Sequence, residues 1–148
     1  MNNLKEKHIE NKTPKESLID ELTKHGFEKI PADLNEEQLK GILEFYITKV
    51  VKNIEYGQLY PFSVEKTDNG DLTVILLMYN RSTLPFALGS LPFKLKDANN
   101  NVVFADLVNL DKVVDSNKVG IYYIKIDREN LKEENMDLST WTITFEAE

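Results

Sequence analysis

Oxygen-bearing side chains recur at alternate positions in the segment DANNNVVFAD. Asp97, Asn99 and Asn101 match the first three ligand positions of an EF-hand calcium loop, in which oxygen donors converge on one ion. The rest of that loop does not fit, because it needs glycine where Val102 stands and a bidentate glutamate where Val108 stands. Asparagine tolerates the left-handed backbone of tight turns, so the segment predicts a turn between two strands and no metal site.

The two histidines are the next candidates for chemistry. His25 precedes Gly26, the residue expected to end a helix, and a cationic side chain there suits the negative end of the helix dipole. Neither His8 nor His25 stands in a serine-nucleophile signature, and the glycines form no phosphate-binding loop. The enzymatic alternative therefore depends on residues distant in sequence: Asp97, Asp106, Glu55 and His25. No spacing supports it, so we expect a non-enzymatic protein without a cofactor.

A short helix is expected near the start of the chain. Thr13 suits the N-cap, Pro14 the first helical position and Glu16 the third, where it completes a capping box. Gly26 is the expected stop. This helix must carry His25 at its C-terminal end.

A second helix is predicted from the N-cap Asn35, with Gln38 completing its capping box and Leu34 packing on Leu39. Apolar residues then follow at three-and-four spacing as far as Ile54. Five of them form what we call the candidate partner face: Leu39, Ile42, Leu43, Tyr46 and Val50. This face either covers the rest of the protein or recruits a protein partner or a second copy.

After Tyr56 the hydrophobic pattern changes to short runs rich in β-branched and aromatic residues, which is typical of strands. Two hairpins are predicted, one across Asn69 and Gly70 and one across the asparagine turn. The runs cover residues 58–66, 72–80, 91–97, 102–108, 118–127 and 141–148. The fold class is therefore α+β, with a helical segment at 1–57 and an antiparallel sandwich or barrel at 58–148.

Large aromatic residues in these strands are expected to fill a core: Phe93, Phe104, Tyr122, Trp141 and Phe145. Trp141 and Phe145 are an even number of residues apart, so they share one face of a predicted strand. The alternative for Trp141 is an exposed platform for a peptide or a glycan.

The composition of the chain limits the classes of molecule that it can bind and the chemistry that it can carry out. The 148 residues fit one domain, and the formal net charge of -7 disfavours nucleic acid, whose phosphates require clustered lysine and arginine. Cysteine is absent, so disulfides and thiolate chemistry are excluded. No apolar run approaches the roughly 20 residues needed to cross a bilayer, and the first residues carry no apolar signal region. We therefore expect a cytoplasmic protein without membrane insertion, which reaches the envelope only through a partner.

Two stretches resemble the SLAP domain, a small β module of Gram-positive bacteria. They read YNRSTLPFALGSLPFKLKDANNNVVFADLVNL and LKEENMDLSTWTITFEAE, and the resemblance covers residues 58–148. The first carries the family's L-P-x-x-L-x-D pattern and the second its closing D-L-S-x-W-x-I-x-F pattern. These patterns place family motif residues at Leu91, Pro92, Leu95, Asp97, Asp137, Leu138, Ser139, Trp141, Ile143 and Phe145.

The resemblance implies an immunoglobulin-like sandwich of about six or seven strands, in proteins linked to surface-layer assembly or accessory secretion. It carries over no catalytic residues. The leading hypothesis is a non-catalytic protein-interaction module, acting through the candidate partner face or by adding a peptide strand to the edge that begins at Leu59, although Pro61 opposes the latter. The alternative is a small enzyme, or a sandwich that binds a peptide or glycan.

Overall fold

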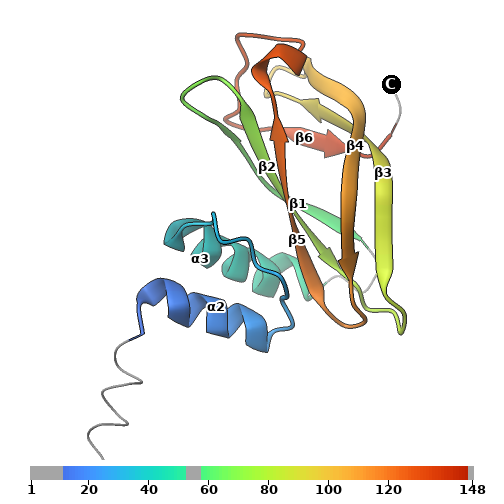
Figure 1. The fold of residues 1–148 in the computed structure, drawn as a ribbon. Coiled ribbons are helices and arrows are strands. Elements are labelled where there is room, and N and C mark those ends of the chain that lie inside the picture. The colour runs from blue at the N-terminus through green and yellow to red at the C-terminus, as the bar shows by residue number, and fades with distance from the viewer. Residues whose placement is uncertain (1–11, 53–57, 147–148) are drawn as a thin grey trace, which may run out of the picture.

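The computed structural model describes residues 12–52 and 58–146 and arranges them in three layers, as Figure 1 shows. One layer is helical, and the other two are three-stranded antiparallel sheets. The α+β class is confirmed. The elements are α2 (Pro14–Lys24), α3 (Glu36–Phe45), the π-helical turn η1 (Tyr46–Val50), β1 (Leu59–Lys66), β2 (Leu72–Tyr79), β3 (Phe86–Lys96), β4 (Val102–Val114), β5 (Val119–Ile126), the 3-10 turn η2 (Arg128–Asn130) and β6 (Thr142–Thr144).

Both predicted capping boxes are present. The Thr13 hydroxyl accepts from the Glu16 N–H at 3.1 Å, and the Glu16 carboxylate accepts from the Thr13 N–H at 3.2 Å. Asn35 and Gln38 make the same pair of bonds at 2.7 and 2.9 Å. Gly26 follows α2 with a φ of 101°, a conformation that suits glycine.

The second helix changes from α-helical to π-helical geometry part-way along. Helix α3 stops at Phe45 and continues as η1, in which the Val51 N–H donates to the Tyr46 carbonyl at 2.9 Å. Arg81 donates to the carbonyls of Val50 and Val51 at 2.8 and 3.3 Å and lies over the Tyr79 ring. An arginine after β2 therefore caps the helical segment at its negative end. The predicted end at Ile54 lies outside the described residues.

Sheet A has the strand order β1–β2–β5, and sheet B has the order β4–β3–β6. Strand β2 lies in the middle of sheet A, and its apolar run LTVILLMY is buried on both faces because the helices cover one face and sheet B covers the other. The predicted turn between β1 and β2 is present, and Gly70 takes a φ of 92° there. Asn100 takes the left-handed position, with a φ of 67°, in the asparagine turn between β3 and β4.

Strands β3 and β4 are longer than predicted, whereas the last strand is shorter. Strand β6 spans three residues and pairs only with residues 94–96 of β3. Pro92 precedes that segment and has no N–H to donate, so it limits how far a neighbouring strand can pair. The six strands form a sandwich, with the larger core between the sheets.

The second core lies between the helices and sheet A. It joins Leu22, Phe27 and Leu34 to residues of β2 and β5. The boundary expected at 57/58 adjoins residues 53–57, outside the described residues. Over the ranges 12–52 and 58–146, no helix is long and apolar enough to cross a membrane.

Candidate functional site

The candidate partner face of the second helix packs on sheet A. Leu39, Ile42, Tyr46 and Val50 are buried, and Leu43 packs half-buried against the same cluster. The strand side of this cluster consists of Tyr60, Ile75, Leu77, Val119 and Ile121. These side chains are therefore covered by sheet A, and a partner could reach them only if the helices left the sheet. The face covers one side of the sandwich, which is the other arrangement that the sequence allowed.

Asp97 is the most connected of the motif residues. Its side chain is buried, with 4% of the residue exposed. One carboxylate oxygen accepts from the N–H groups of Asn99 and Asn101 at 2.9 and 3.0 Å, and the other accepts from the Asp137 N–H at 3.3 Å. The Ala98 N–H also donates to the Asp137 carbonyl at 2.8 Å. Asp97 therefore fixes the β3–β4 turn and ties it to the second motif, and its oxygens face backbone donors instead of an ion.

The closing motif packs along the main core. Leu138, Trp141, Ile143 and Phe145 are half-buried against the cluster between the sheets. At the start of this motif the Ser139 hydroxyl and N–H both bond to the Asp137 carboxylate and hold the pKa of that carboxyl below its ordinary range. The remaining motif residues lie on β3, where Leu95 is fully buried and Leu91 partly so, with Pro92 beside it.

Trp141 precedes β6 and does not lie within it. Its indole is partly buried against the main core, and Phe145 packs on the same core from the other end of the short strand. The predicted shared face is therefore a pair of aromatic residues that flank β6. The core interpretation fits this position better than a free platform does, although the ring is not enclosed.

Of the four residues named for an enzymatic alternative, the three that the structure describes do not come together. His25 is the C-cap residue of α2, its ring makes a tilted contact with the Tyr46 ring, and it lies next to the start of β5, since the Gly26 carbonyl accepts from the Val119 N–H. Asp97 lies at the opposite end of the sandwich, in the turn that begins β4, and Asp106 is exposed along β4. Glu55 lies outside the described residues. Within the part of the chain that the structure describes, no three His, Asp or Glu side chains are placed to hold a metal ion.

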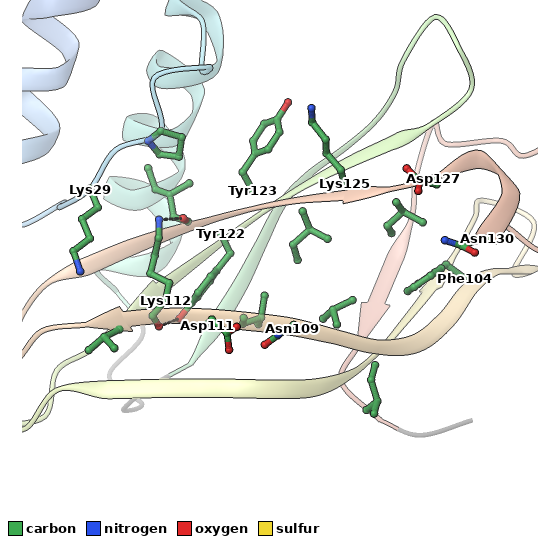
Figure 2. A pocket seen from close by; sticks show the side chains of 18 residues that line it. Lys29, Phe104, Asn109, Asp111, Lys112, Tyr122, Tyr123, Lys125, Asp127 and Asn130 are labelled. Atoms are coloured by element: carbon green, nitrogen blue, oxygen red, sulfur yellow. Dashed lines mark hydrogen bonds between the residues drawn. The ribbon is translucent and has the colours of Figure 1, made fainter.

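A groove of about 880 Å³ runs along the open side of the sandwich, between the edge strands β4 and β5. Figure 2 shows it with the residues that line it. Its floor is apolar because it is the margin of the main core. The floor residues are Phe104, Val108, Leu110, Tyr122, Ile124 and Ile126. Leu107 lines the groove and is 62% exposed, so apolar surface continues onto the rim.

Lys112 crosses this groove at one end. Its ammonium donates to the Ile121 carbonyl of β5 at 2.6 Å, and its own carbonyl accepts from the Tyr122 hydroxyl at 3.3 Å. Burial is the main cause that lowers the pKa of Lys112, and the positive charge of Lys29 lowers it further, while Glu28 opposes the shift. Lys29 lies beside Lys112 in Figure 2, whereas Asp127 and Asn130 lie at the far end of the groove. The groove is thus apolar along its floor and positively charged at one end.

Comparison with models of known protein families identifies the family of this chain. A model of the SLAP domain matches residues 29–147. The chain belongs to the SLAP domain family. The match begins well before the expected residue 58 and includes α3, which is consistent with a helix that forms part of the core of the domain. Comparison with curated proteins and with solved structures found no match.

A buried asparagine fixes the connection that follows β2. Asn80 is 1% exposed and donates to the carbonyls of Leu84 and Val114, both at 2.9 Å. Its side-chain oxygen accepts from the N–H and hydroxyl of Ser82 at 3.0 and 2.6 Å. Asn80 therefore holds the β2–β3 loop against the end of β4. Like Asp97, it stabilises a connection between strands through its side-chain hydrogen bonds.

The groove was not found from the sequence. Its lysines and its apolar floor come from β4, β5 and the segment after α2, which are separated in the chain. The only local signal is Lys112, a charged residue within the otherwise strand-like run LVNLDKVV. An inward-pointing charge is one way in which proteins protect an exposed strand edge.

Proposed function

We propose that this SLAP domain is a non-catalytic protein-interaction module that binds its partner in the groove between β4 and β5. The observation that carries the proposal is the combination of two strand edges, an apolar floor and one positive end in a single elongated groove. Such a groove offers the alternation of apolar and polar contacts that protein segments use.

The family suggests where such a module works. SLAP domains are associated with surface layers and accessory secretion, and we propose that this chain binds a protein in one of those processes in a Gram-positive bacterium. We also propose an immunoglobulin-like classification of its sandwich and a cytoplasmic site of action, with the envelope reached through the partner. Cell fractionation followed by immunodetection tests the location, and recovery in an extracellular fraction would contradict it.

Site-specific photo-crosslinking tests the binding role. A benzoylphenylalanine in place of Asn109, which lines the groove, should yield a discrete cross-linked protein in the cells that make this chain. The same residue in place of Lys40, exposed on α3, is the matched control and should not yield that product. The identified partner should then bind the purified domain, and Leu107→Glu on the exposed rim should weaken binding about tenfold without changing the melting temperature. Equal products from both positions, or none from Asn109, would refute the proposal.

A further inference from the structure

The outer edge of β5 already pairs with part of the chain itself. The Val119 N–H donates to the Gly26 carbonyl at 2.9 Å, and the Glu28 N–H donates to the Val119 carbonyl at 3.2 Å. Phe27, between them, forms an isolated parallel bridge with Val119. The pairing ends at Lys29, where a φ of 51° turns the chain away from the sheet. This edge can therefore accept an extended segment, and its own segment covers only the beginning.

The rest of that edge can be worked out from the strand register. Strand β5 pairs with β2 without a register shift, so backbone groups alternate between facing β2 and facing outward. The backbone N–H and C=O groups of Val119 face outward. Those of Ile121, Tyr123 and Lys125 therefore face outward as well. The Ile121 carbonyl is occupied by Lys112. Within residues 12–52 and 58–146, the outward N–H groups of Tyr123 and Lys125 donate no hydrogen bond and their outward C=O groups accept none.

The facing edge of β4 is less available. The Leu107 N–H is bonded to the Asp106 carboxylate at 2.7 Å, and the Val103 carbonyl accepts from the Lys132 N–H at 2.7 Å. The β1 edge of sheet A carries Pro61 and a register shift between Pro61 and Ser63, both of which oppose pairing. Of the β1, β4 and β5 edges, the Tyr123–Lys125 segment of β5 is the one best prepared for another strand.

The charges beside this edge define the occupant. Lys29 and Lys112 lie together at one end of the groove, on a protein whose net charge is -7. Neither lysine forms an ion pair with a carboxylate in the part of the chain that the structure describes. Glu28, whose negative charge raises the pKa of Lys112, has its carboxylate engaged by the Asp115 N–H at 3.0 Å. An incoming carboxylate is therefore favoured at this end.

We propose that an extended segment of the partner, carrying an acidic side chain, adds to β5 at Tyr123–Lys125 as a seventh strand. This inference rests on the proposed function and specifies how the groove is used. Alternate side chains of the segment cover the apolar floor at Val108 and Ile124, and its carboxylate meets the ammonium groups of Lys112 and Lys29. Main-chain hydrogen bonds to β5 supply affinity for the segment, while the apolar floor and the two lysines determine which segment sequences bind.

Selection from a phage-displayed library of random heptapeptides on the intact chain provides the probe. We expect enrichment of sequences that alternate apolar and polar residues and contain Asp or Glu. A synthetic peptide of the enriched sequence is then titrated by calorimetry. Lys112→Glu should reverse the preference, so that a peptide with Lys in place of the acid binds more tightly than the original.

A proline pair tests strand addition itself. Lys125→Pro removes an outward N–H from β5. Its matched control is Lys66→Pro on β1: because the Thr67 N–H pairs inward with the Asp71 carbonyl at 2.8 Å, the N–H of Lys66 faces outward. We expect Lys125→Pro to weaken binding about tenfold and Lys66→Pro to change it less than twofold. Circular dichroism checks the fold of both variants. If Lys125→Pro unfolds, peptide-induced protection of the Tyr123 and Lys125 amides in the unaltered chain decides instead.

Several results would overturn this inference. They are the absence of any enriched peptide, equal effects of the two prolines, and protection confined to another edge. A dimer in sedimentation that Lys125→Pro abolishes and Lys66→Pro preserves would assign the edge to a second copy and also overturn it. If the Asn109 position cross-links a partner but neither proline changes peptide binding, strand addition is contradicted and the proposed function stands. If the Asn109 position yields no cross-linked partner, both the strand addition and the proposed function are contradicted.

Discussion

Substitutions of Asp97 should measure how much the β3–β4 turn, and its link to the closing motif, contribute to the stability of the fold. Asp97→Ala removes an acceptor from the N–H groups of Asn99, Asn101 and Asp137. Asp97→Asn keeps one oxygen for the turn and removes the acceptor that faces Asp137. The two substitutions therefore distinguish the turn from its link to the closing motif.

The magnitude follows from the bonds. A hydrogen bond contributes about 1 kcal/mol net, and a charged acceptor contributes more, so three bonds predict a loss of about 3 kcal/mol in the free energy of unfolding for Asp97→Ala. Asp97→Asn should lose about 1 kcal/mol, because the bond to Asp137 is the longest of the three, at 3.3 Å. Asp106→Ala is the matched control. Asp106 is exposed and bonds locally to the Leu107 N–H, so we expect a loss below about 0.5 kcal/mol.

Urea denaturation measures these differences, with Trp141 fluorescence and far-ultraviolet circular dichroism as separate probes. Trp141 is the single tryptophan and lies in the segment that Asp97 holds. Its fluorescence therefore reports both on detachment of this segment and on global unfolding. Coincident transitions would validate a two-state analysis. The reasoning is refuted if Asp97→Ala is no more destabilising than Asp106→Ala, because the buried carboxylate would then stabilise nothing beyond what an exposed one does.

Three further predictions follow from burial and ionisation. Trp141→Ala should lower the free energy of unfolding by about 2 kcal/mol, less than the 3 to 5 kcal/mol typical of an enclosed aromatic ring, and unchanged thermal denaturation would place the indole outside the core. Ile42→Asp should unfold the protein, whereas Ile47→Asp should be tolerated because Ile47 is 46% exposed; circular dichroism that shows both variants folded would contradict the packing of α3 on sheet A. Burial first, and then the neighbouring Tyr79, raise the pKa of Tyr46 to about 12 from 10.0, so the folded state keeps a proton that the unfolded state loses and stability falls between those two pH values. Tyr46→Phe should reduce this fall in urea titrations across that range, and an identical fall in both proteins would exclude Tyr46 as its source.

Local features were predictable from the sequence. The capping boxes at Thr13 and Asn35 involve side chains and N–H groups within four residues, so residue type alone specifies them. The turns at Gly70 and Asn100 were predictable for the same reason, since few residues tolerate positive φ.

Long-range features were not predictable in the same way. The apolar face of α3 has the same pattern whether it covers a sheet or meets a partner. The apolar run of β2 offered a clue, because a strand apolar on both faces needs a cover on each side. The groove depends on which strands become edges, and strand order is set by pairings across the chain. The extent of β6 depended on its partner as well, since Pro92 of β3 limits the pairing.

Amide hydrogen exchange of β5, followed by nuclear magnetic resonance, tests most directly the claim that this domain receives its partner at a free strand edge. In the isolated chain the amides of Tyr122 and Ile124, which face β2, should exchange slowly, while those of Tyr123 and Lys125 should exchange quickly. Binding of the partner should slow the second pair and leave the first unchanged. Equal protection of all four amides in the isolated chain would mean that the edge is already covered, and this result would contradict the account.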